Sequence, residues 1–106
     1  MKIELYTDKA QVLTNKIFKS VDDETIKTWI SKTDTMGVKY LTHKPEQWED
    51  KAVFVFEAEK FKLVITLLWL TGNEPTNDIK GYYMGRFTEI LLVHFSNEFS
   101  KFEIIK

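Results

Sequence analysis

The chain has 106 residues, of which 43% are hydrophobic and 29% charged. This composition is typical of one globular domain and excludes a disordered or collagen-like chain, so we expect a single domain over residues 1–106. Basic and acidic side chains number 15 and 16 and are interspersed along the chain. Because duplex binding depends on clustered lysine and arginine, this balance argues against nucleic acid as a partner.

The sequence also lacks the segments expected of exported or membrane proteins. Residues 1–6 alternate charged and apolar side chains, whereas a signal peptide needs an unbroken apolar segment. The longest apolar run, residues 63–70, is far shorter than the roughly 20 residues that span a bilayer. We therefore expect a cytoplasmic, bacterial-style domain with no membrane partner.

The N-terminal segment predicts a strand followed by a helix. Residues 2–6 alternate with period two, which is typical of a short strand. Asp8 is then placed to cap a helix whose apolar residues recur at helical spacing over residues 10–18.

A second helix is predicted over residues 22–32. The acidic residues 22–24 suit the positive end of a helix dipole, and the helix should stop before Gly37. Its apolar residues recur at helical spacing: Ile26, Trp29 and Ile30. Residues 38–41 are then free to be extended, and residues 43–50, with Pro45, predict a surface connection.

Residues 53–70 predict a β-hairpin around which the rest of the domain should be organised. Two runs of β-branched and aromatic residues flank a charged break at residues 57–62. The second run, residues 62–70, is apolar on both faces, with these residues on one face: Leu63, Ile65, Leu67 and Trp69. Such a strand should be central in its sheet, with Trp69 buried.

Breakers and cap residues fill residues 71–78, so this segment predicts a loop, with Asn77 or Asp78 as the N-cap of the next helix. Residues 79–97 form the longest helical pattern, and its broad apolar arc should lie flat on the sheet. Residues 101–105 alternate again and predict a last strand.

Apart from one of the two N-terminal helices and the short extended stretch at residues 38–41, these elements follow the order β-α-β-β-α-β. We therefore predict an α+β fold: a mainly antiparallel sheet of four to five strands, in ferredoxin-like order, with an extra N-terminal helix. Because the helices of so short a chain cover one sheet face better than two, the second face needs cover from the N-terminal helices or from a second subunit. We favour a homodimer that uses the sheet or its edge.

Arg86 is the single arginine among 14 lysines, and it lies on the polar side of the long helix. A guanidinium is suited to clamp a carboxylate or another anion. The simpler interpretation, which we favour, is a surface residue paired with Glu89 at i, i+3. Tyr82 also faces outward beside Arg86, and both residue types are enriched at protein–protein hot spots.

Three further residues are candidates for a binding site. His94 lies near the edge of the apolar arc, where a half-buried histidine is a simpler interpretation than a general base. An apolar cavity between sheet and helices would be lined by Tyr83, His94, Trp69 or Arg86. The full candidate set is therefore Tyr82, Arg86, Glu89, Tyr83, His94 and Trp69.

No catalytic, nucleotide or metal motif is present, and the chain has no cysteine. We therefore predict no cofactor, no metal and no catalytic residues. The leading hypothesis is a small non-enzymatic protein-interaction module, such as a regulator, an inhibitor or an immunity-type protein that acts by docking to a protein partner. The alternative is a small-ligand binder or cofactor-free enzyme with an apolar cavity between sheet and helices.

Overall fold

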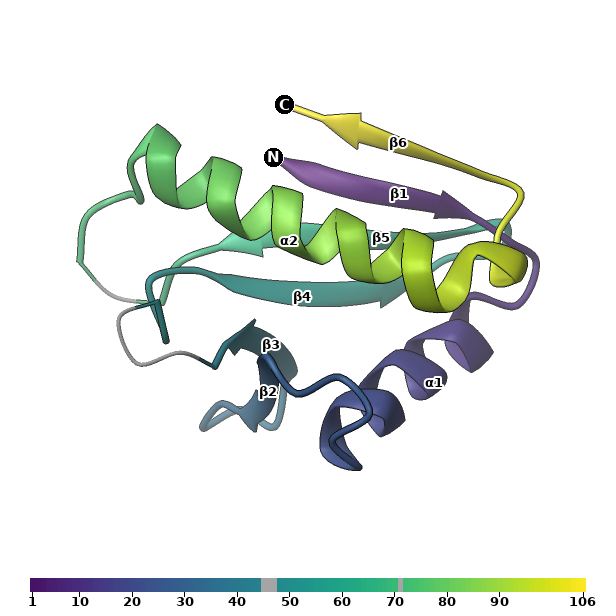
Figure 1. The fold of residues 1–106 in the computed structure, drawn as a ribbon, viewed down its shortest axis with the longest axis horizontal. Helices are drawn as coiled ribbons and strands as arrows, with labels where there is room; N and C mark the ends of the chain where they lie inside the picture. The colour runs from purple at the N-terminus through teal and green to yellow at the C-terminus, as the bar shows by residue number, and fades with distance from the viewer. Residues whose placement is uncertain (45–47, 71) are drawn as a thin grey trace.

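A computed structural model describes residues 1–44, 48–70 and 72–106 of the chain. The described residues form six strands, two α-helices and a short 3-10 helix (Figure 1). In chain order these are β1 (Lys2–Tyr6), α1 (Ala10–Asp22), β2 (Trp29–Thr33), β3 (Lys39–His43), β4 (Val53–Ala58), β5 (Lys62–Leu68), α2 (Asn77–Phe95), η1 (Ser96–Glu98) and β6 (Lys101–Ile105).

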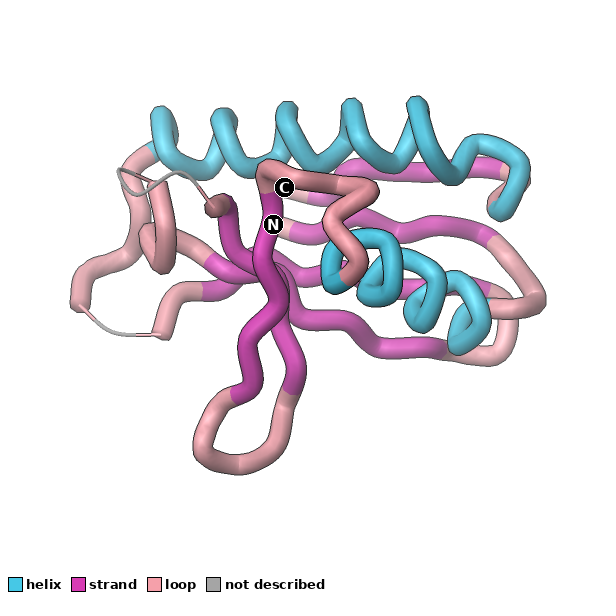
Figure 2. Tube along the Cα trace, turned by 60° about the horizontal axis from the view of Figure 1, so that its bottom comes forward, coloured by secondary structure: helices cyan, strands magenta, loops and turns pink. Residues whose placement is uncertain are grey.

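The strands form one sheet in the order β2-β3-β4-β5-β1-β6, and every neighbouring pair is antiparallel. Helix α2 forms a layer across this sheet, while the β2–β3 hairpin projects away from it (Figure 2). The predicted α+β class with an antiparallel sheet is confirmed. The strand count is six rather than four or five, and the ferredoxin-like order is not confirmed.

The β4–β5 hairpin supplies the centre of the core, as its sequence pattern predicts. Cross-strand pairing places Phe54 beside Leu67 and Phe56 beside Ile65, so these side chains share one face of the sheet. Apolar residues of α1 and α2 join the same buried cluster, so both helices pack on this face. The largest fully buried side chains include Tyr83, Phe54, Phe87, Leu13, Ile17 and Leu91.

The helix predicted over residues 22–32 is wrong. Helix α1 continues to Asp22, the chain turns at Glu24, where φ is 64°, and β2 begins at Trp29. The three apolar residues that fit helical spacing are instead divided between the turn and β2. Burial of the Trp29 ring in the common core overrides the weak local preference for a helix.

The segment after β2 confirms the extended structure expected near residues 38–41, which becomes β3. A tight turn joins the two strands: the Asp34 carboxylate accepts hydrogen bonds from the backbone N–H groups of Met36 and Val38. Gly37 has φ 87° in this turn, a conformation that favours glycine. His43, expected in a surface connection, is the last residue of β3 and is buried. Pro45 lies outside the described residues.

Two apolar side chains on the second face of the sheet are buried although no helix covers that face in the described residues. Val53 and Val64 point away from the helices, yet they are only 0% and 6% exposed. Lys62 runs across this face to the buried Glu4 carboxylate, with Nζ 2.9 Å from Oε2. Long lysine stems cover apolar surface while their charged ends stay paired, so Val53 and Val64 are buried without a second subunit.

Trp69 is not the buried centre of a strand, as the sequence predicted. Strand β5 ends at Leu68, whose partner Val53 is the first residue of β4, so the sheet ends there. Beyond that pair, Trp69 is 40% exposed. The apolar run extends two residues past the point where neighbouring strands can cover it.

Trp29 and Trp69 should differ sharply in their contribution to stability. We expect Trp29→Ala to lower the free energy of unfolding by about 3–5 kcal/mol, because a fully packed aromatic ring is removed. Trp69→Ala should cost about 1 kcal/mol or less, because its ring is partly solvated. Urea unfolding of the two variants measures this difference, and equal losses would contradict the burial of Trp29 or the exposure of Trp69.

Helix α2 contains Gly85 in its interior, where an added Cβ meets nothing within 4 Å. Gly85→Ala should therefore raise the free energy of unfolding by about 0.5–1 kcal/mol, by reducing the freedom of the unfolded chain. Gly37→Ala is the matched control and should destabilise, because Gly37 has a positive φ. Thermal unfolding of both variants tests the pair, and a lower Tm for Gly85→Ala would show that something occupies that flank of α2.

Candidate functional site

Helix α2 presents three of the candidate residues on the flank that faces β2 and β3. The helix begins after Thr76, whose hydroxyl accepts a hydrogen bond from the Ile79 N–H, so the N-cap is Thr76 rather than Asn77 or Asp78. Tyr82, Arg86 and Glu89 recur at helical spacing, which places them on one side of the helix. Trp48, which lies between β3 and β4 in the chain, contacts this side.

Trp48 completes a short column of stacked groups with these residues. Its ring lies parallel to the Tyr82 ring, with centroids 3.9 Å apart and an angle of 8° between the planes. The Arg86 guanidinium lies 5.5 Å from the centroid of the same Tyr82 ring. We call the residues Trp48, Tyr82, Arg86 and Glu89 the Tyr82 surface.

Arg86 takes the surface position that the sequence favours. Its Nη1 lies 3.9 Å from Oε1 of Glu89, and both side chains are more than half exposed. An exposed ion pair at this distance stabilises the fold little, so the guanidinium is available to another carboxylate.

A hollow of about 290 Å³ opens beside the Tyr82 surface, and its lining also includes Thr28, Trp29, His43 and Ile90. Trp29 and His43 form an aromatic pair with ring centroids 4.8 Å apart. Trp29 Nε1 and His43 Nδ1 are closed off from solvent and find no hydrogen-bond partner within the described residues. A buried polar atom without a hydrogen-bond partner destabilises a folded protein.

Burial lowers the pKa of His43 below its ordinary value, and the positive charge of Arg86 adds to this effect. The imidazole is therefore neutral near pH 7. A neutral ring is the form that can remain buried among Trp29, Tyr82 and Tyr83.

Tyr83 has a structural position beneath the surface. It is fully buried, and its hydroxyl lies 3.2 Å from Thr42 Oγ1 and donates to the Trp48 carbonyl. Thr42 Oγ1 in turn donates to the Ala52 carbonyl. Tyr83 thus fixes the backbone that carries Trp48, but it presents nothing to solvent.

The remaining candidates lie elsewhere. His94 is exposed in the last turn of α2, not half-buried, and Trp69 lies beyond the end of β5. The structure therefore brings together Tyr82, Arg86 and Glu89 and leaves the other two apart. Sequence reasoning missed Trp48, His43 and Trp29 as neighbours of these residues, because all three contacts join segments that are distant along the chain.

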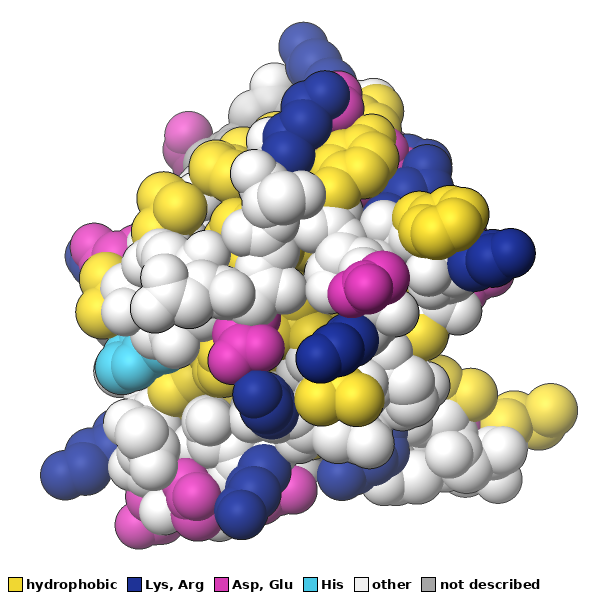
Figure 3. All heavy atoms as spheres, turned by 90° about the vertical axis from the view of Figure 1, so that its right-hand side faces the viewer, with side chains coloured by type: hydrophobic (Ala, Val, Ile, Leu, Met, Phe, Trp, Pro, Cys, Tyr) yellow, Lys and Arg dark blue, Asp and Glu magenta, His cyan; other side chains and the backbone are white. Residues whose placement is uncertain are grey.

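Charged groups do not separate by sign over the part of the surface seen in Figure 3, where basic and acidic side chains are interspersed. Within the described residues, no group of three histidine or acidic side chains is arranged to hold a metal ion. Neither described helix combines the length and the apolar run needed to cross a bilayer.

Comparison with protein-family models, with curated proteins and with solved structures finds no match for this chain.

Stability should depend on pH through His43. Because its pKa is lowered in the folded state, the unfolded chain binds the proton more readily. The contribution of His43 is therefore complete above about pH 6.5 and is lost as pH falls through the unfolded pKa toward the folded pKa. Free energies of unfolding measured from pH 7.5 to 5 should fall for the wild type.

Two variants serve as controls, and for each the free energy of unfolding is measured against pH. His43→Asn should flatten the decline between pH 6.5 and 5, whatever its absolute stability. His94→Asn changes an exposed side chain and should leave the decline in place. An unchanged slope in His43→Asn would show that other groups dominate acid unfolding.

Proposed function

We propose that this chain is a small non-enzymatic protein-interaction module that docks a protein partner through the Tyr82 surface. The observation that carries the proposal is the stacked column of Trp48, Tyr82 and Arg86 at the rim of a hollow. Tryptophan, tyrosine and arginine are the residues enriched at binding hot spots.

The geometry supports docking because the column is held in place before a partner arrives. Tyr82 is fixed between the Trp48 ring and the Arg86 guanidinium, and the Trp48 backbone is held by Tyr83. A side chain that is already ordered loses less conformational freedom on binding. The partner best suited to this surface offers an apolar or aromatic group for the rings and a carboxylate for Arg86.

The alternative function is a small-ligand binder or cofactor-free enzyme, which needs a cavity between the sheet and the helices. That space is occupied by fully buried side chains, including Tyr83, Phe54 and Phe87. The hollow beside Arg86 lies at the rim instead, next to the exposed column. This position favours the insertion of one side chain of a protein partner.

The proposal includes a homodimer in the cytoplasm. The sequence pattern predicts an apolar second sheet face for this contact, but Val53 and Val64 on that face are already buried. The sheet edge therefore becomes the better candidate for contact between two copies.

Docking is tested by affinity capture from the native cell, comparing the wild type with Tyr82→Ala and Arg86→Gln. We expect a partner that the wild type retains and both variants lose at least tenfold, which corresponds to about 1.4 kcal/mol or more. Arg86→Gln should change the free energy of unfolding by no more than about 0.5 kcal/mol, because the residue is exposed.

The matched control is Phe61→Ala. Phe61 is 65% exposed in the β4–β5 turn, at the opposite end of the molecule from the start of α2 (Figure 1). A docking partner should be retained by this variant as by the wild type. If no retained protein depends on Tyr82 or Arg86, the Tyr82 surface is not the docking site.

A further inference from the structure

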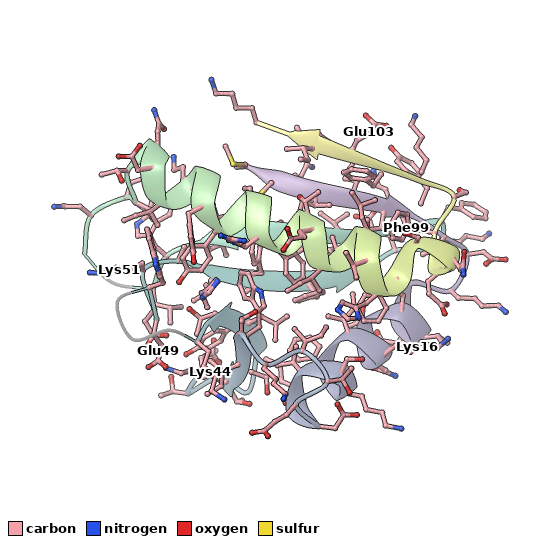
Figure 4. All side chains as sticks on the ribbon, in the orientation of Figure 1. Lys16, Lys44, Glu49, Lys51, Phe99 and Glu103 are labelled. Atoms are coloured by element: carbon pink, nitrogen blue, oxygen red, sulfur yellow. The ribbon has the colours of Figure 1, made fainter. Side chains whose placement is uncertain are left out.

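Strand β6 has a neighbour on one side only within the described residues, because the sheet order ends at β6. Figure 4 labels Glu103 on this strand and Phe99 in the segment that precedes it. An edge strand offers unpaired backbone groups, which makes it a template for pairing with another strand.

Hydrogen bonds of β1 identify which groups of β6 point outward. The Thr7 N–H donates to Phe61 and the Leu67 N–H to Met1, so the odd-numbered residues of β1 bond to β5. The even-numbered residues therefore bond to β6, where their partners are Lys101, Glu103 and Ile105. The N–H and C=O groups of Phe102 and Ile104 then point away from the sheet.

The opposite edge of the sheet is strand β2, which has neighbours from α1. Strand β2 runs beside the end of α1, where the Ser31 hydroxyl donates a hydrogen bond to Asp22. The residues that join α1 to β2 include the buried Ile26, which packs into the core. Strand addition is therefore better suited to β6 than to β2.

The side chains of β6 select one register for pairing with a second copy. A two-fold axis through Phe102 places Lys101 of each copy opposite Glu103 of the other and pairs the two Phe102 residues. An axis through Glu103 would instead place two carboxylates face to face, which is unfavourable. An axis through Ile104 would leave Lys101 without an acidic partner.

Apolar surface near the edge fits the same contact. Ile104 is 51% exposed and lies on the face that carries the helices, opposite Ile3. Phe102 is half-buried on that face. Lys101 and Glu103 lie on the other face, where their side chains are 3.0 Å apart and both partly exposed.

We infer that two copies of this chain pair antiparallel through β6, centred on Phe102, so that their two sheets become one continuous sheet. This inference rests on the homodimer included in the proposed function and names its interface. It is independent of the Tyr82 surface, so each can fail without the other.

A charge exchange tests the register. Lys101→Glu and Glu103→Lys should each raise the dimer dissociation constant at least about tenfold, because each places like charges opposite one another twice per dimer. The double variant restores opposite charges and should return to within about threefold of the wild type. Sedimentation equilibrium gives the constants, and Lys60→Glu in the β4–β5 turn is the control for net charge.

Amide exchange gives a second test that needs no variant. The N–H groups of Phe102 and Ile104 should exchange more slowly as the protein is concentrated into the dimer. The amides of Lys101, Glu103 and Ile105 already bond to β1 and should change little.

Two results would overturn the inference. A mass near 12.5 kDa at every concentration would show that the chain is monomeric. The interface would also lie elsewhere if neither charge reversal changed the dimer dissociation constant and the amide exchange rate of Phe102 did not depend on protein concentration.

Discussion

The hydroxyl of Tyr83 is buried where α2 passes over the ends of β3 and β4, and a buried phenol requires a hydrogen-bond partner. It donates its proton to the carbonyl of Trp48 and lies 3.2 Å from Thr42 Oγ1 on β3. This contact ties the longest helix to the projecting β2–β3 hairpin and fixes the backbone at Trp48. The stacking of Trp48 on Tyr82, and with it the proposed docking surface, depends on that arrangement.

The two proposed contacts lie at opposite sides of the sheet. The Tyr82 surface lies over Trp29 and His43, which belong to β2 and β3, whereas β6 is the other edge of the strand order. Pairing through β6 would leave the Tyr82 surface of each copy open. A dimer of this kind presents two docking surfaces, so a partner with two matching sites would bind with an increased effective concentration.

Period-two patterns predicted the strands well where the chain alternates, as in residues 2–6 and 101–105. The same reasoning failed at Ile26, Trp29 and Ile30, because a turn followed by a strand can imitate helical spacing over so few residues. It also failed at Trp69, since an apolar run in the sequence does not show where the neighbouring strand begins. The pairing of Leu68 with Val53, the first residue of β4, shows where the strand ends, and this pairing is known only from the structure.

The sequence alone determined the features that depend on residues close together in the chain. These are the hairpin, the long helix, and the exposed pairing of Arg86 with Glu89. Tertiary structure alone decided that Trp48 stacks on Tyr82, that His43 is buried beneath them, and that β6 forms one edge of the sheet. Each of these depends on contacts between segments far apart in the chain. Such contacts follow from how the sheet is ordered and which face the helices cover, and a one-dimensional pattern does not encode that choice in any single stretch.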